Sequence, residues 1–535
     1  MLVLENVRLE VGEAEEVLAA RAAERLGLSP QALGRVEVVH RALDARRKRD
    51  IHWSLHLGLE LPVDADRARL LAEGRVRPPG QAAKEPLDAA ILGGVPRGER
   101  PLPAPPLVVG SGPGGLFAAW LLAREGYAPV VLERGPSVEK RVRQVNAFDQ
   151  GGPHDPESNI LFGEGGAGTF SDGKLTCRVR TPLVALVHDL LVAAKAPPDI
   201  KVQAKPHVGT DRLRAVLVYL RRELERLGAT FRFGARMDDL LVEEGRVAGV
   251  RLATGELLRS GAVVLATGHS ARDTYELLIR RGVLLEFKPF QLGLRIEHPQ
   301  ALIDQAQYGA LCGRLPVAEY ALNDKKQGVF SFCMCPGGTL MASVSEAGHL
   351  CTNGMSRRLR DSGRANSGLV LTVSARMAGS KHPLAGVELQ RRLEKRGFEL
   401  GGGNYDLPAQ RAQDFLAGRA SKGVVLHSSY PRGLRGTDLR HVLPSGTARL
   451  MADSLRRFEQ LIPGYAGPDA LLVGPEARGS SPVRIPRREE TRESVSTPGL
   501  YPVGEGAGYA GGIMSAAVDG LRSAAALIQA WAPAG

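Results

Sequence analysis

The segment between residues 106 and 135, PLVVGSGPGGLFAAWLLAREGYAPVVLERG, constrains the fold of this chain more than any other stretch. An apolar run leads into a glycine turn, a helix-like run and a second apolar run that ends in Glu133. This order predicts a βαβ unit. Gly110, Gly112 and Gly115 are spaced so that the turn is tight, a pyrophosphate can approach the backbone, and the helix packs closely on the strand. The unit therefore predicts dinucleotide binding, in which Glu133 would bind the adenosine ribose. The alternative is a turn with a purely structural role.

Two later stretches repeat the form of a strand that ends in a turn. They are AVVLATGH at 262–269 and LYPVGEGAG at 500–508. The second continues as GEGAGYAGGIMSAAVDG, 504–520, in which a glycine-rich loop leads into an alanine-rich helix. Such a late turn is either a second nucleotide site or the closing part of the first domain.

A chain of 535 residues is too long for one ordinary core, so two or three domains are expected. The fold class is predicted to be α/β, with a Rossmann-like domain interrupted by an insertion. Residues 31–47 read as either helix or strand. The expected organisation is a small N-terminal α/β domain of ferredoxin-like type (1–75), a stiff extended linker (76–106), the first part of the nucleotide-binding domain (107–284), an inserted mixed α+β substrate domain (285–475), and the closing part of the nucleotide-binding domain (476–535).

The net charge of +12 is concentrated in one region. Residues 351–440 contain 16 basic and 7 acidic side chains, which indicates either a solvated basic face or an anionic substrate or partner. The chain carries no zinc-finger or RNA-binding signature, so nucleic acid is disfavoured. Five cysteines in so long a chain favour a reducing compartment, and no apolar run reaches membrane-spanning length, so we expect a cytoplasmic protein.

The later turns are similar to those of flavoproteins in the glutathione-reductase-like and aromatic-hydroxylase-like superfamily. In those proteins a turn like Ala266, Thr267 and Gly268 lies near the nucleotide, and a late Gly-Glu such as Gly504–Glu505 contacts the ribityl chain of FAD. Longer motifs resemble the large family of uncharacterised bacterial and plastid FAD-dependent dehydrogenases: FGEGGAGTFSDGKL (162–175), FCMCPGG (332–338), SEAGHLCTNGMS (345–356), SSPVRI (480–485) and RALDARRKRDIHWSLHL (41–57). The resemblance implies that the late turn closes a single FAD site.

The resemblance also implies a role for each matching residue. Met237 would offer backbone groups to adenine, and Glu505 would hold the ribityl chain. The flavin face or pyrophosphate would lie along Gly165, Gly166, Gly168, Ser171 and Lys174. The flavin N1–C2 edge, where reduction builds negative charge, would face Gly511, Gly512 and Ile513.

The chemistry of the substrate is less constrained. The sequence lacks the redox cysteine pair of the disulfide reductases after the first βαβ unit, and it lacks a second G-x-G-x-x-G, so NAD(P)H can bind but has no dedicated site. The sequence does not identify the catalytic residues, and the candidates are His269, Cys333 and Lys174. His269 could transfer a proton or simply be a packed histidine. Cys333, in a C-x-C with Cys335, could be redox-active or simply buried, and a metal site is not expected.

These expectations combine into one function with two alternatives. The protein is predicted to be an FAD-dependent oxidoreductase that transfers hydride between flavin N5 and an unidentified small molecule, for which the basic stretch makes an anion one candidate. The first alternative is a non-catalytic or redox-sensing flavoprotein that binds a partner through residues 1–75. The second is an RNA-associated flavoenzyme that docks through Arg46–Arg49 and the basic stretch.

Overall fold

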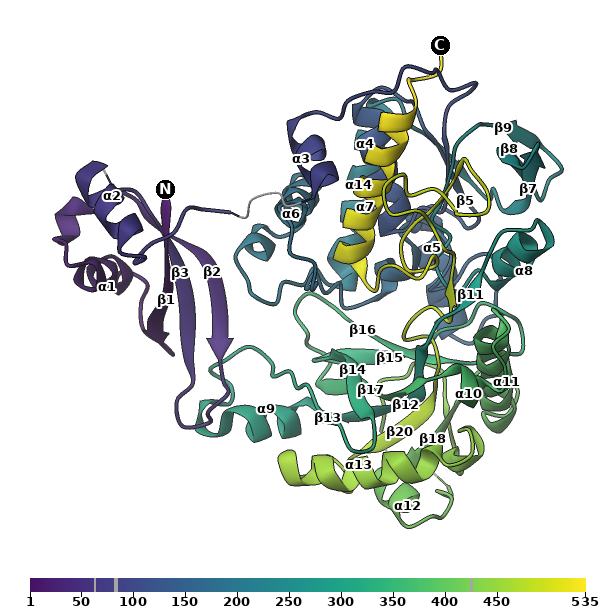
Figure 1. Ribbon diagram of the computed structural model, residues 1–535. Coiled ribbons are helices and arrows are strands. Elements are labelled where there is room, and N and C mark those ends of the chain that lie inside the picture. Colours follow the sequence, from purple (N-terminus) through teal and green to yellow (C-terminus); the bar gives the residue numbers. More distant parts are fainter. Residues whose placement is uncertain (62–63, 81–84, 424–426) are drawn as a thin grey trace.

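The N-terminal region forms a small antiparallel sheet covered by helices. The computed structural model describes residues 1–61, 64–80, 85–423 and 427–535 (Figure 1). The sheet has the order β1-β3-β2, and a single antiparallel bridge joins Val3 to Arg77 at the free edge of β1. This bridge lies where the fourth strand of a ferredoxin-like sheet would be. Residues 36–44 form a strand, β2, that pairs with β3. The elements are β1 (Leu2–Glu10), α1 (Val17–Leu26), η1 (Pro30–Ala32), β2 (Val36–Asp44), β3 (His52–Leu59) and α2 (Asp64–Ala72).

The segment after this sheet is not uniformly extended as we expected. It contains α3 (Pro86–Gly93), which begins with proline at its first position. Buried Asp88 of this helix accepts hydrogen bonds from Arg522 Nε at 2.8 Å and from Thr181 Oγ1 at 2.5 Å. These contacts anchor the helix to the main body of the molecule.

A five-stranded parallel sheet organises the body, in the order β22-β10-β4-β5-β6. Its strands come from three distant parts of the chain, as predicted for an interrupted Rossmann-like domain. The strands are β4 (Leu107–Val109), β5 (Val130–Glu133), β6 (Thr230–Phe233), β10 (Val263–Leu265) and β22 (Leu500–Pro502). The helices and turns that accompany the sheet are α4 (Pro113–Arg124), α5 (Val138–Asp149), η2 (Gly166–Phe170), α6 (Leu183–Ala193), η3 (Pro198–Lys201), α7 (Thr210–Arg226) and α14 (Ile513–Ala530).

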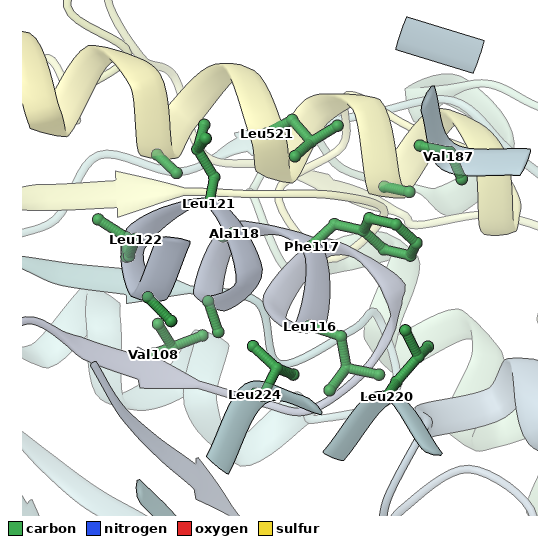
Figure 2. Close-up of a cluster of buried hydrophobic side chains, with 14 of the residues drawn as sticks. Val108, Leu116, Phe117, Ala118, Leu121, Leu122, Val187, Leu220, Leu224 and Leu521 are labelled. Carbon is green, nitrogen blue, oxygen red and sulfur yellow. The ribbon is translucent and has the colours of Figure 1, made fainter. Parts of the chain in front are cut away.

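The core of this body surrounds α4, which carries apolar residues on nearly every side. Figure 2 shows Leu521 of α14 on one side of α4 and Leu220 and Leu224 of α7 on the other. The opposite side of the sheet packs against a second apolar cluster formed with α8 (Arg272–Arg280) and a three-stranded antiparallel sheet. That small sheet contains β7 (Met237–Glu243), β8 (Arg246–Leu252) and β9 (Leu257–Arg259).

The inserted region is built on a seven-stranded sheet with the order β13-β14-β17-β12-β20-β18-β19. Its pairs are antiparallel except for β18 and β19. It lies below the parallel sheet in Figure 1, with β15 and β16 near the junction. Its strands are β12 (Phe290–Pro299), β13 (Asn323–Asp324), β14 (Val329–Cys335), β17 (Arg364–Val373), β18 (Leu407–Arg411), β19 (Leu434–Gly436) and β20 (Leu471–Glu476).

Short pairs and helices complete this region. Two-stranded sheets join β15 to β16 and β11 to β21. No helix within the described ranges combines the length and apolar character needed to cross a membrane. The remaining elements are β11 (Glu286–Phe287), α9 (Gln300–Tyr308), η4 (Gly309–Leu311), β15 (Gly338–Ala342), β16 (Thr352–Ser356), α10 (Ala375–Ala378), α11 (Ala385–Leu400), α12 (Ala412–Leu416), η5 (Leu439–His441), α13 (Thr447–Leu461) and β21 (Val483–Arg484).

Candidate functional site

A cavity of about 980 Å³ lies where the parallel sheet meets the inserted sheet. It starts at the carboxyl ends of β4, β5, β10 and β22, where open α/β sheets place their ligands. Most of the residues singled out from the sequence line it together: Gly110, Gly112, Glu133, Gly166, Gly168, Ser171, Lys174, Met237, Ala266, Thr267, Gly268, His269, Cys333, Gly504, Glu505, Gly511, Gly512 and Ile513. Gly115 and Gly165 are not in the lining.

Each glycine of the first turn is explained by a different physical reason. Gly110 has φ +104°, and a Cβ there would lie 2.4 Å from the carbonyl oxygen of Ala266. A Cβ on Gly115 would lie 1.9 Å from the Gly110 carbonyl oxygen, so this glycine permits close packing of α4 and does not touch a ligand. A Cβ on Gly112 would meet nothing within 4 Å. The open space at Gly112, next to the uncapped start of α4, is a cradle of the kind that holds a pyrophosphate.

Glu133 is buried at the end of β5, and protein groups already surround its carboxylate. Oε2 accepts from Ser111 N at 3.0 Å and from Ser111 Oγ at 2.7 Å. Oε1 accepts from Gly135 N at 2.9 Å and from Gly163 N at 3.0 Å. A carboxylate offers about four acceptor positions. A ribose hydroxyl would therefore have to replace one of these donors, and the Ser111 hydroxyl is the one free to rotate.

The second glycine loop lies against the first. Gly165 N donates to Ser111 O at 3.0 Å, and a Cβ on Gly166 would lie 3.3 Å from Gly112 Cα. Gly165 has φ +82°, and its Cβ position is filled by Thr169 and Leu217. Gly165 thus packs behind the loop and presents Gly166 to the cavity.

The late turn brings a carboxyl group and a helix start into the same cavity. Glu505 follows β22, and burial raises the pKa of its carboxyl to about 7, although Lys288 opposes the shift. Gly511 and Gly512 precede α14, and a Cβ on either would meet nothing within 4 Å. This end of the cavity therefore offers backbone N–H groups and a helix dipole to a bound group.

Buried ions hold the late turn in place, and the sequence analysis did not single them out. Asp519 of α14 accepts from Gly504 N at 2.7 Å and from Arg487 Nη1 at 3.0 Å, and it also pairs with Arg492. These residues come from separate stretches of the chain. A buried acid in an otherwise apolar helix, AAVDGL, was the available signal.

His269 and Lys174 have surroundings that restrict what each can do. Burial and the cations Arg478 and Arg272 lower the pKa of His269 to about 3, so its imidazole is neutral near neutral pH. Lys174 Nζ donates to Asp172 Oδ2 and to Met334 O, both at 2.6 Å. Lys174 therefore links the nucleotide-binding region to β14 at the cavity wall.

The inserted region contributes cavity residues to which the sequence analysis gave no individual role. Three stretches that resembled the family contain Phe332, Asn353, Gly354 and Ser480, whereas no quoted motif contains Gln291, Arg478 and Gly479. Arg478 is held by Glu394, with Arg478 Nη2 2.7 Å from Glu394 Oε2. Across the described part of the chain, no group of three or more His, Cys, Asp and Glu side chains is arranged to hold a metal.

Comparison with known proteins places this site in a family. The profile described as "FAD-dependent protein, C-terminal domain-like" matches residues 289–479, and "FAD dependent oxidoreductase" matches 206–311. An NAD(P)-binding Rossmann-like profile matches 108–167, and a domain of unknown function matches 1–60. A Clostridium beijerinckii protein named "Uncharacterized protein" is 41% identical over 534 residues, 98% of each chain. The chain belongs to the FAD-dependent oxidoreductase family. Its cofactor is FAD, and the open glycine turns and the two helix starts along the cavity fit that molecule.

Other similarities to this oxidoreductase are more limited. A phytoene desaturase (neurosporene-forming) of Cereibacter sphaeroides is 38% identical over 74 residues, 14% of each chain. The L-proline dehydrogenase of P. horikoshii is 13% identical, with 80% of this chain and 91% of that one covered at a TM-score of 0.30. The glycine oxidase of Geobacillus kaustophilus is 12% identical, with 79% and 92% covered at a TM-score of 0.33. Similarity at these values carries no argument about the substrate.

Proposed function

We propose that this oxidoreductase is a dehydrogenase of the glutathione-reductase-like superfamily that moves hydride between a small anionic substrate and N5 of FAD. The observation that carries the proposal is one cavity lined by both glycine turns and by the inserted sheet. FAD, when bound, supplies the ring that exchanges hydride. The protein supplies binding, orientation and exclusion of water.

Under this proposal, each part of the cavity holds a different part of the cofactor. Backbone groups of Gly110, Gly112 and Gly166 would face the pyrophosphate. Glu133 would hold the adenosine ribose, with the Ser111 hydroxyl turning away. The ribityl chain would lie on Glu505, and the flavin N1–C2 edge would face the N–H groups at 511–513.

The substrate would lie between the flavin and the inserted sheet. The described residues of 351–440 contribute only Asn353 and Gly354 to the lining, so the basic excess of that stretch does not itself form the pocket. Two cations support an anionic substrate instead. Lys174 is partly exposed to the cavity, and Arg178 lines it without an ion pair among the described residues.

We also propose three separate domains. The first is residues 1–75, the second is residues 285–475, and the third combines residues 107–284 with 476–535.

The test is anaerobic reduction of the FAD-loaded protein by a panel of small anions and their neutral amides or esters. A substrate should bleach the oxidised flavin and support turnover with an artificial acceptor. The Lys174→Gln variant should raise KM for the anion about tenfold or more, as expected for a lost charged hydrogen bond, whereas Lys325→Gln at an exposed position should not. Equal rates with anions and neutral analogues would refute an anionic substrate, and a flavin that no compound reduces would refute the dehydrogenase.

A further inference from the structure

Cys333 and Cys335 lie at the cavity wall in an unusual stretch of strand. Cys333 lines the cavity and is half-buried, whereas Cys335 is fully buried behind it. Phe332 pairs with Gly368 and Cys335 pairs with Asn366, so β14 contains one extra residue between these two pairs. Cys333 has φ +44° at this bulge, which is a strained conformation for a residue with a Cβ. Bulges of this kind re-aim side chains next to active sites.

A hydrogen bond links the two cysteines, and cations contact the backbone around them. The Cys335 thiol donates to the Cys333 carbonyl oxygen at 3.4 Å. Lys174 Nζ binds the intervening Met334 carbonyl oxygen at 2.6 Å. Arg295 Nη1 approaches the Cys333 carbonyl oxygen at 3.4 Å. The pair therefore consists of one accessible sulfur and one buried sulfur beneath it.

The charges around Cys333 favour its thiolate. The hydrogen bond from Cys335 and the nearby Lys174 and Arg295 lower the pKa of the Cys333 thiol to about 6, although burial opposes the shift. The same hydrogen bond and burial raise the pKa of Cys335. The titratable and charged groups that act on Cys333 are Cys335, Lys174, Arg295, Glu476 and Glu505. Cys333 therefore has the properties of a nucleophilic cysteine, and Cys335 has those of a resolving cysteine.

We propose that Cys333 and Cys335 form a redox-active dithiol that exchanges two electrons with the FAD bound in this cavity. Closing the pair forms one S–S bond and breaks the Cys335 S–H bond. It releases two electrons and one proton, and oxidised FAD is the acceptor. Opening the disulfide takes the same two electrons and one proton back. The inference rests on the proposed function only in placing FAD in this cavity.

The thiolate is tested by alkylation with iodoacetamide across pH, with and without bound FAD. Cys333 should react at pH 7 about two- to threefold faster than an ordinary thiol, because its larger thiolate fraction outweighs its lower nucleophilicity. The fast phase should titrate near pH 6 and disappear in Cys333→Ser. It should persist in Cys177→Ser, because Cys177 lines the same cavity but burial raises its pKa. A rate no faster than that of Cys177 would overturn the proposal.

The disulfide is tested in Cys351→Ala. Trypsin releases residues 327–357 as one peptide, and this change leaves Cys333 and Cys335 as its only cysteines. After diamide oxidation the peptide should be lighter by two hydrogen atoms and should resist alkylation until it is reduced. An unlinked peptide would overturn the proposal.

Electron exchange with FAD is tested by anaerobic dithionite titration after diamide treatment. Cys351→Ala should take up two pairs of electrons per FAD, one for the flavin and one for the disulfide. The Cys333→Ser, Cys351→Ala double variant should take up one pair, for the flavin alone. Equal uptake would show that the pair does not exchange electrons with FAD. Substrate-driven flavin reduction in Cys333→Ser separates this failure from a failure of the proposed function.

Discussion

Glu133 and Glu505 are two acidic residues at the cavity whose surroundings differ sharply. Four hydrogen bonds from backbone and hydroxyl donors surround the Glu133 carboxylate. Glu505 lies in the cavity wall after β22, and burial raises the pKa of its carboxyl to about 7 although Lys288 opposes the shift. Under the proposed binding mode, the ionisation of Glu505 therefore makes FAD binding depend on pH.

We expect FAD affinity to rise with pH through about 7, because only ionised Glu505 accepts two ribityl hydrogen bonds without carrying its own proton. Glu505→Gln should weaken binding about tenfold or more at pH 8 and flatten the pH dependence. Titration of the FAD-free protein with FAD, followed by flavin fluorescence from about pH 6 to about pH 8, measures both effects. Glu490→Gln, at an exposed position nearby in sequence, is the control. An unchanged pH profile in Glu505→Gln would place the ribityl chain elsewhere.

Close backbone packing governs the contact between α4 and α14. A Cβ on Gly520 of α14 would lie 2.1 Å from the Gly114 carbonyl oxygen of α4, so the two helices approach at glycine. Leu521 then packs onto the apolar surface of α4 (Figure 2). The starts of both helices line the cavity, and under the proposed binding mode the start of α14 would face the flavin and the start of α4 the pyrophosphate. Their contact therefore sets the relative position of the two helix starts.

Two alanine substitutions separate packing from ligand binding within one turn. Gly112→Ala should leave stability within about 1 kcal/mol, because φ is −70° and its Cβ position is open, yet lower FAD affinity at least about tenfold. Gly115→Ala should destabilise the protein by about 1–3 kcal/mol or more, because its Cβ would strike the Gly110 carbonyl oxygen. Urea unfolding of the FAD-free protein and FAD titration distinguish the two outcomes. If Gly112→Ala binds FAD normally, the cradle lies elsewhere.

A buried ion network joins the two main parts of the molecule. Glu394 of α11, in the inserted region, is fully buried. Its carboxylate oxygens lie 2.6 Å from Nη2 of Arg272, in α8, and 2.7 Å from Nη2 of Arg478. Although burial would raise it, these two cations lower the pKa of Glu394 to about 2. The network connects the parallel-sheet body to the inserted sheet directly beside His269.

Glu394→Gln should lower the free energy of unfolding by about 3 kcal/mol or more near neutral pH, since it leaves two buried cations without full compensation. The folded-state pKa of Glu394 lies below its unfolded value, so its contribution is complete above about pH 4.5 and is lost as pH falls toward about 2. Urea unfolding at several pH values should show the difference from wild type shrinking in acid. Glu388→Gln, exposed on the same helix, should have little effect. A constant difference across this range would mean that Glu394 is not ionised in the fold.

The sequence alone determined the parts that depend on local geometry. Gly110, Gly112 and Gly115 predicted the β4–α4–β5 unit, because a tight turn and a close helix approach exclude side chains at those positions. Alternation and apolar runs predicted the α/β class. The ferredoxin-like expectation fits the observed strand order, whereas α3 was missed within a stretch rich in proline and glycine. The domain boundaries and the role of each residue toward FAD remain predictions.

The tertiary structure alone decided which distant residues meet at the cavity. Burial lowers the pKa of His269 and raises that of Glu505, and Cys335, Lys174 and Arg295 lower the pKa of Cys333. Glu394 and Arg478 are separated by more than eighty positions, and no spacing relates them. Backbone propensity and side-chain period act over a few residues. Electrostatic and packing energies depend on neighbours in space, and those neighbours exist only once the insertion has folded against the parallel sheet.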